Sequence, residues 1–123
     1  MDKRKERHDE ILEKARETFL EKGFFHTVMD DIAKRAGITR RTLYRYFESK
    51  EDLAYETIIQ LLKEWNNYQK TIFDQLHGKG IERLECFLNK LIDYMSARIE
   101  VMRYLGEFEF YFTDERIKEL KTD

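Results

Sequence analysis

Apolar residues recur every three or four positions along most of the chain, and this is the period of an amphipathic α-helix. The first apolar stripe lies between charged residues and consists of Ile11, Leu12, Ala15, Phe19 and Leu20. Gly23 follows it, and glycine readily takes the positive φ that ends many helices. The pattern therefore predicts a helix over residues 6–22. No segment alternates with the period of two that indicates a half-buried strand.

Two short helices are predicted next. Thr27 is the expected N-cap of the second helix, with Asp30 completing an approximate capping box, and Gly37 ends this helix. Thr39 is the expected cap of the third helix. The residues expected to face inward from this pair are Val28, Ile32, Ala33, Ala36, Leu43, Tyr46 and Phe47.

Three longer helices are predicted in the rest of the chain. The fourth begins at the cap pair Ser49 and Asp52 and reaches about His77. Two glycines then break the chain, and an amphipathic stripe predicts a fifth helix over about residues 81–95. An aromatic-rich sixth helical segment, interrupted by Gly106, completes an all-α fold.

These elements divide the chain into two expected parts. Residues 1–50 form a three-helix helix-turn-helix DNA-binding domain. Residues 51–123 form a long connecting helix and a partial helical regulatory or dimerisation domain. The total of 123 residues is about one ordinary domain, or a small module joined to part of a second.

Charge is distributed unevenly between these parts. The formal net charge is only -2, but residues 1–50 hold 13 Lys and Arg against 10 Asp and Glu, whereas residues 51–123 hold 10 against 15. A basic first part followed by an acidic second part suits a protein that binds nucleic acid with one end. The basic residues nearest the predicted turn are Lys34, Arg35, Arg40, Arg41, Arg45 and Lys50, opposed only by Glu48.

Helix-turn-helix geometry gives these residues roles. Two helices that cross closely need a small residue at the crossing and a glycine in the turn, and Ala33 and Gly37 fill these places. The start of the third helix can then enter the major groove of DNA, where Arg40, Arg41 and Thr42 are the expected base readers. Arginine pairs bidentately with guanine, and threonine contacts a base edge or the thymine methyl group.

Phosphate contacts are expected around this reading helix. Tyr44 and Arg45 lie on its outer surface, and Lys50 lies in the first turn of the next helix. Thr27 and Thr39 are first of all helix caps, and a phosphate contact is an added role for each. Looser contacts from a mobile N-terminal arm are expected of Lys3, Arg4, Lys5 and Arg7.

The stretch TVMDDIAKRAGITRRTLYRYFESKEDL resembles the DNA-binding module of the TetR family of transcriptional regulators. The resemblance covers about residues 8–55 and rests on the IA..AG turn, the TLYRYF helix and the SKEDL segment. It implies that Arg40, Arg41 and Thr42 face bases, and that a homodimer reads a near-palindromic operator in double-stranded DNA. The residues that it implies touch phosphates are Tyr44, Tyr46 and Lys50.

Two points qualify this resemblance. Periodicity places Tyr46 on the inner flank of its helix, whereas the resemblance gives its hydroxyl to a phosphate; both hold if the ring packs and the hydroxyl reaches outward. The chain is also shorter than complete members of the family. The regulatory domain is therefore expected to be incomplete, and a homodimer is expected of the complete protein.

Aromatic and methionine residues gather in the second part of the chain, and two interpretations stay open. They could line a pocket for a small apolar or aromatic effector, or they could be core, which is more common for aromatics at helical spacing. The candidate pocket residues are Trp65, Tyr68, Phe87, Met95, Met102, Tyr104 and Phe108.

Other chemistry is not expected. His8, His26 and His77 lie far apart in sequence, with neither ligand spacing nor a cysteine partner, so no metal site is predicted. Cys86 is the only cysteine and is expected to be a buried thiol. No set of nucleophile, base and orienting group can be assembled, and no cofactor is expected.

The expected function is a sequence-specific DNA-binding transcriptional regulator, most simply a repressor that a small-molecule effector releases. The chain starts with charged residues and has no membrane-length apolar run, so a cytoplasmic protein with no membrane partner is expected. One alternative is a helical interaction or dimerisation module whose DNA-binding part acts without an effector. A helical enzyme is a second alternative, with no catalytic set to support it.

Overall fold

The structure is a computed structural model that describes the backbone of residues 2–122 and the side chains of residues 2–111 and 113. Its helices are α1 (Lys3–Lys22), α2 (Met29–Ala36), α3 (Arg40–Tyr46), α4 (Lys50–Gln75), α5 (Ile81–Ser96) and α6 (Ile99–Thr122). No strand occurs within the described backbone, which confirms the all-α prediction.

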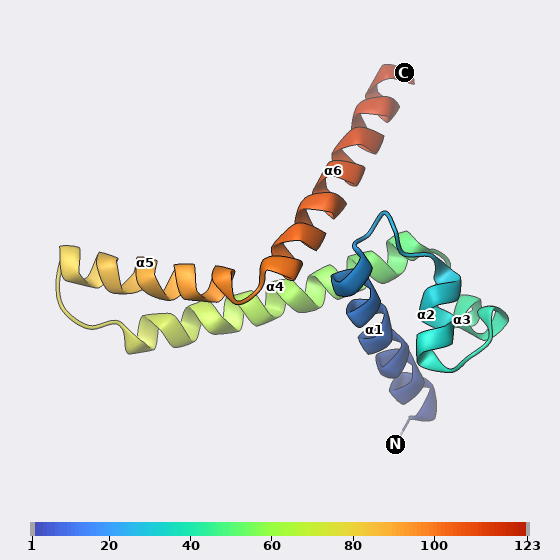
Figure 1. Ribbon diagram of the computed structural model, residues 1–123, viewed down its shortest axis with the longest axis horizontal. Helices are drawn as coiled ribbons and strands as arrows, with labels where there is room; N and C mark the ends of the chain where they lie inside the picture. Colours follow the sequence, from blue (N-terminus) through green and yellow to red (C-terminus); the bar gives the residue numbers. More distant parts are fainter. Residues whose placement is uncertain (1, 123) are drawn as a thin grey trace.

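The helices form a compact head at one end of a long helical arm. Figure 1 shows α1, α2 and α3 gathered at one end of α4, and α5 running back along the other end of α4. After α5 the chain turns into α6, which passes close to α1 and then extends away from the head. Residues from the second half of the chain therefore contact the first helix.

One hydrophobic core joins the head to α4 and α6. Phe19 stacks on Tyr104 of α6 with ring centroids 5.2 Å apart, and both side chains are fully buried. The buried apolar residues of this core are Ile11, Leu12, Ala15, Phe19, Phe24, Met29, Ile32, Ala33, Leu43, Phe47, Leu53, Ala54, Leu61 and Tyr104. The sequence boundary between residues 50 and 51 stays a prediction, and this core extends across it.

The start of α1 differs from the prediction. The helix begins at Lys3 instead of residue 6, because the Asp2 carboxylate accepts a hydrogen bond from the Arg4 N–H at 3.0 Å and caps the first turn. The basic residues assigned to a mobile arm, from Lys3 to Arg7, are therefore helical, and that assignment was wrong. This first turn has no apolar position that would mark it in the sequence.

The cap of α2 lies one residue later than predicted. Val28 is the N-cap, and the Asp31 carboxylate accepts its N–H at 3.3 Å. The hydroxyl of Thr27 is used elsewhere, since it donates to the Gly23 carbonyl at 2.7 Å. The inward register shifts accordingly, with Val28 54% exposed and Met29 buried.

The turn and the next two caps were predicted correctly. Gly37 takes the left-handed conformation with φ 70°, and the Ile38 N–H donates to the Ala33 carbonyl at 3.0 Å to close the end of α2. Thr39 caps α3 by accepting the Thr42 N–H, and Ser49 caps α4 in the same way. The angle between α2 and α3 is therefore set by local sequence.

The second half contains two further differences. α4 ends at Gln75, two residues before the expected end, and α6 continues through Gly106 without the predicted interruption. Several apolar residues of the predicted α5 stripe remain exposed. They are Ile81, Leu84, Leu88, Ile92 and Met95.

Candidate nucleic-acid interface and apolar cavity

The predicted base readers at the start of α3 differ in the contacts that they make within the protein. Arg41 is exposed and makes no hydrogen bond or ion pair within the described part of the chain. Arg40 lies 5.7 Å from the centre of the Tyr44 ring, and its Nε is 3.6 Å from an Asp30 carboxylate oxygen. Hydrogen bonding to Tyr44 and the charge of Asp30 raise the pKa of Arg40. Arg41 is thus free to contact DNA, whereas Arg40 is already partly held.

Thr42, the third predicted reader, faces the cap of its own helix. Its Oγ1 lies 2.9 Å from Oγ1 of Thr39, and its N–H donates to the same Thr39 oxygen at 3.2 Å. The Thr42 hydroxyl therefore has a local partner in this conformation. Its methyl group does not depend on that hydrogen bond, and the base-reading role of Thr42 stays a prediction.

The aromatic residues of α3 lie at its edge as the sequence suggested. Tyr44 is 41% exposed, and Arg45 is exposed. Tyr46 packs partly against the core, and the guanidinium of Arg4 lies 5.1 Å above its ring. The packed ring fits the proposed division of Tyr46 between core and surface, while its phosphate contact and those of Tyr44 and Arg45 stay predictions.

The basic first turn of α1 is a feature that the sequence reasoning placed wrongly. The stacking of Arg4 on Tyr46 brings this turn beside α3, in a fixed helix instead of a mobile arm. Cation–π stacking of this kind orients a guanidinium on an aromatic face. The only sequence signal was Asp2, a good N-cap residue in front of four basic residues.

Lys50 points toward the core instead of outward. Its ammonium donates to the Phe24 carbonyl at 2.9 Å and lies 4.3 Å from the centre of the Phe24 ring. Partial burial lowers the pKa of Lys50. A phosphate contact by this ammonium stays a prediction, and it can use another of the three ammonium N–H donors while one stays on the Phe24 carbonyl.

Thr27 has no surface available for a phosphate. The residue is fully buried, and its hydroxyl already donates to the Gly23 carbonyl. The structure therefore removes Thr27 from the predicted phosphate-contacting set. The misassignment follows from the shift of the α2 cap to Val28.

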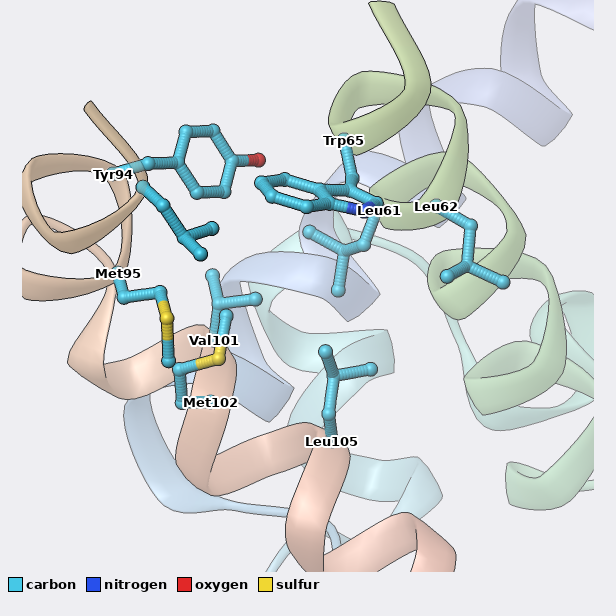
Figure 2. A pocket seen from close by; sticks show the side chains of 9 residues that line it. Leu61, Leu62, Trp65, Tyr94, Met95, Val101, Met102 and Leu105 are labelled. Atoms are coloured by element: carbon cyan, nitrogen blue, oxygen red, sulfur yellow. The ribbon is translucent and has the colours of Figure 1, made fainter. Parts of the chain in front are cut away.

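An apolar cavity of about 300 Å³ lies between α4, α5 and α6. Figure 2 shows Leu61, Leu62 and Trp65 of α4 on one side, and side chains of α5 and α6 opposite them. The Tyr94 ring closes one end, with its centroid 5.0 Å from that of Trp65. The remaining lining residues are Leu91, Met95, Val101, Met102 and Leu105.

Three of the seven predicted pocket residues line this cavity, namely Trp65, Met95 and Met102. The other four do not. Tyr68 stacks against Tyr94 with ring centroids 4.4 Å apart, and Phe87 packs against Phe73 farther along the arm. Their placement corrects the predicted set.

Tyr104 and Phe108 belong to the core instead. The Tyr104 hydroxyl lies 2.6 Å from Oγ1 of Thr57 and donates to the Ala54 carbonyl at 3.2 Å, and burial raises its pKa. Phe108 packs edge-on against Phe24, 5.7 Å between centroids. Sequence reasoning favoured aromatic residues and so missed the aliphatic walls of the cavity, whose only signal was their ordinary helical spacing.

Metal-binding groups and membrane-spanning helices are both absent from the part of the chain that the structure describes. Among the described residues, no three His, Cys, Asp or Glu side chains gather in a way that could hold a metal ion. No helix in that part of the chain is both long and apolar enough to span a bilayer.

Comparison with known proteins identifies similar sequences. The family model for bacterial regulatory proteins of the tetR family matches residues 11–57. An HTH-type transcriptional regulator of Staphylococcus aureus is 30% identical over 139 aligned positions, covering 97% of this chain and 75% of the relative. A counterpart from another strain of the same species is 30% identical over 144 positions, with the same coverage.

Solved structures give a similar result for the fold. A TetR-family regulator from Mesorhizobium loti has a TM-score of 0.70 and 20% identity, over 99% of this chain and 60% of that protein. The flavonoid-responsive regulator FrrA has a TM-score of 0.51 and 29% identity, over 82% of this chain and 52% of FrrA. The chain thus spans three quarters of the Staphylococcus relatives, and between half and two thirds of these two solved proteins.

Proposed function

Since the chain belongs to the TetR family of transcriptional regulators and carries the helix-turn-helix DNA-binding domain of that family, we propose that it is an operator-binding repressor released by a small apolar effector. The observation that supports DNA reading most directly is the exposed Arg41 at the start of α3, which has no hydrogen-bond or ion-pair partner among the described side chains. The relatives are named as transcriptional regulators, so the proposed activity is binding and not catalysis.

The proposed interface divides α3 and its neighbours by role. Arg40, Arg41 and Thr42 read base edges in the major groove, and Arg40 exchanges its contact with Asp30 for one with a base. Side chains at the edge of the groove hold phosphates and fix the register of the protein on the duplex. This second set consists of Thr39, Tyr44, Arg45, Tyr46 and Lys50.

The operator is proposed to be a near-palindrome read by two copies of the protein. A helix-turn-helix dimer places its two reading helices one turn of DNA apart, so the symmetry of the site mirrors that of the protein. Selection of bound duplexes from a random pool tests this proposal. A two-fold symmetric consensus is expected, whereas recovery of sequences without any shared motif would contradict sequence-specific binding.

The effector is proposed to occupy the cavity between α4, α5 and α6. Every side chain that lines it is aliphatic, aromatic or a thioether, so a neutral apolar or aromatic molecule suits it better than an ion does. FrrA, one of the structurally similar proteins, is named as flavonoid-responsive, which supports an aromatic ligand class.

The single tryptophan, Trp65, reports on this cavity directly. Titration with naphthalene as a neutral aromatic probe is expected to change Trp65 fluorescence in a saturable way. Met102→Glu places a charge in the cavity wall and is expected to abolish the change. Leu84→Glu adds the same charge at an exposed position of α5 and serves as the matched control. A linear, unsaturable response in the unmodified chain would contradict the effector site.

A second candidate function is favoured by the exposed apolar residues of α5, which suit a partner-binding or dimerisation surface. In this alternative the DNA-binding head acts without an effector. Naphthalene would then leave operator affinity unchanged, whereas the repressor proposal expects the affinity to fall. Sedimentation with and without the selected duplex shows whether either complex contains two chains.

A further inference from the structure

α6 holds the C-terminal end of α1 through two side chains one turn apart. The Arg103 guanidinium donates to the Leu20 carbonyl at 3.1 Å and to the Glu21 carbonyl at 3.4 Å. The Glu107 carboxylate accepts the Phe24 N–H at 2.7 Å. The last carbonyls of a helix lack partners within that helix, so Arg103 satisfies groups that would otherwise need water.

Gly23 allows this approach. Its φ of +83° is strained for any residue with a side chain, and an added Cβ would lie only 2.4 Å from a Glu107 carboxylate oxygen. The contact between α6 and the loop that follows α1 therefore requires glycine at position 23, both for its backbone conformation and for the space beside it.

The backbone carbonyl of Phe24 is bound by a second side chain, that of Lys50. This carbonyl accepts the hydrogen bond from Lys50, the first residue of α4, and the Phe24 ring lies against the same ammonium. Glu107 and Lys50 thus bind the N–H and the carbonyl of one fully buried residue. This residue connects α6 to the end of the reading head.

The same turns of α6 form one wall of the apolar cavity. Val101, Met102 and Leu105 line the cavity, and Arg103 and Glu107 alternate with them along the helix. Figure 2 shows the three lining side chains directed from α6 toward the α4 side of the cavity. Because a helix moves largely as a rigid element, displacement of this wall also displaces the two polar side chains.

We propose that Arg103 and Glu107 are positioning residues that transmit occupancy of the cavity to the DNA-reading head, through Phe24 and Lys50. The inference rests on the proposed function and specifies the regulation of that same site. An apolar ligand that shifts α6 breaks the Glu107 contact with Phe24 and frees the end of α1. A freed head must be ordered again on DNA, and this cost lowers operator affinity.

Hydrogen exchange at the Phe24 amide tests the coupling without DNA. Val101→Phe adds bulk inside the cavity and is expected to speed exchange at Phe24 by about tenfold, a shift within the range of typical coupling energies. Glu107→Ala is expected to speed it as well, and Val101→Phe in that background should add less than about twofold, because the transmitting contact is already lost. If Val101→Phe does not fold, naphthalene bound to the unmodified chain supplies the same displacement.

Two substitutions separate positioning from general stability. Glu107→Gln keeps a side-chain oxygen that can accept the Phe24 N–H, so it should retain slow exchange, and Glu109→Ala changes an exposed residue of the same helix and should have no effect. Unchanged exchange at Phe24 on filling the cavity would overturn the inference. Additive effects of Val101→Phe and Glu107→Ala on the exchange rate at Phe24 would overturn it too.

Operator affinity gives the second readout. Glu107→Ala is expected to weaken binding to the selected duplex by about fivefold or more, with Glu107→Gln and Glu109→Ala close to the unmodified chain. Equal affinity of Glu107→Ala and the unmodified chain would overturn the coupling alone. Absence of sequence-selective binding by the unmodified chain would instead overturn the proposed function, and the exchange measurement would still decide the coupling.

Discussion

The head and the arm of this molecule carry the same kind of helical apolar stripe, but the stripe is buried in the head and partly exposed in the arm. In the head, Phe19, Leu43 and Leu53 are completely buried. In the arm, Ile81 is 73% exposed and Ile92 is 58% exposed, although both lie on a regular apolar stripe. A helical period thus predicts which residues form a stripe, and the rest of the chain decides whether that stripe has a partner.

The difference between the two regions follows from where their partners lie in the sequence. The stripe of α1 meets α2, α4 and α6, and these contacts close one core. α5 meets the far part of α4 and the start of α6, and this leaves one side of the α5 helix open. Stability should therefore be concentrated in the head and its junction with α6.

Two leucine truncations give the largest expected contrast. Leu53→Ala removes a fully buried side chain from the core and should lower the free energy of unfolding by about 2–5 kcal/mol. Leu84→Ala, at a position that is 53% exposed on α5, should change it by no more than about 0.5 kcal/mol. Denaturant unfolding of both variants measures the difference. Equal losses would show that the arm carries as much of the folding energy as the head.

Two tyrosine hydroxyls give a smaller contrast. Tyr104→Phe removes a buried hydroxyl that bonds to Thr57 and to the Ala54 carbonyl, and it should cost about 0.5–1.5 kcal/mol, the net value of a typical hydrogen bond, because Thr57 keeps its own bond to Ala54. Tyr68→Phe removes a long bond of 3.4 Å to the Lys90 carbonyl in the arm and should be nearly neutral. Thermal melting of the two variants checks this, and a larger loss for Tyr68→Phe would reverse the proposed ranking.

The smallest expected effect concerns an ion pair between α1 and α4. Arg16 binds both Glu64 carboxylate oxygens, at 2.6 and 2.8 Å, and lowers the pKa of Glu64. A carboxyl with a lowered folded-state pKa stabilises the protein above its unfolded pKa, and this contribution is lost as the pH falls through the folded pKa. Both side chains are partly exposed, so removal of the pair by Glu64→Gln should cost only about 0.2–1 kcal/mol at pH 7.

The pH dependence provides the control for this pair. The gap in unfolding free energy between the unmodified chain and Glu64→Gln should close as the pH drops below the ordinary range for carboxyl groups. Glu17→Gln tests a longer and more ordinary surface contact, 3.6 Å from Lys14, and should show a smaller gap. A gap for Glu64→Gln that stays constant down to acidic pH would contradict the role of the ion pair.

Local sequence predicted most of the head because its decisive interactions lie within one turn. The Thr39 and Ser49 caps, the Gly37 turn and the inward Leu43 each depend on residues close in sequence. The predicted start of α2 was wrong for a related reason. Thr27 has the chemistry of a cap, but the preceding loop uses its hydroxyl, and sequence alone does not decide between two acceptable partners.

The remaining features depend on distant residues and carried no local signal. Glu107 and Phe24 are separated by 83 positions, and the contact exists only because α6 returns to α1. Lys50 matched the expected position for a phosphate contact, but the Phe24 carbonyl beside it holds its ammonium. A pocket was one of two interpretations of the aromatic and methionine residues, and the aliphatic side chains from three helices that complete the cavity were not in the candidate set.

If α3 reads DNA sequence as proposed, the exposed Arg41 is the side chain whose loss should change that reading most. Arg41→Ala should weaken binding to the selected operator by about 1–3 kcal/mol and relax base preference at one position of the site, because a bidentate base contact is lost. Lys63→Ala, which removes an exposed charge from the middle of α4, is the control and should bind as the unmodified chain does. Unchanged affinity together with an unchanged base preference in Arg41→Ala would contradict the account.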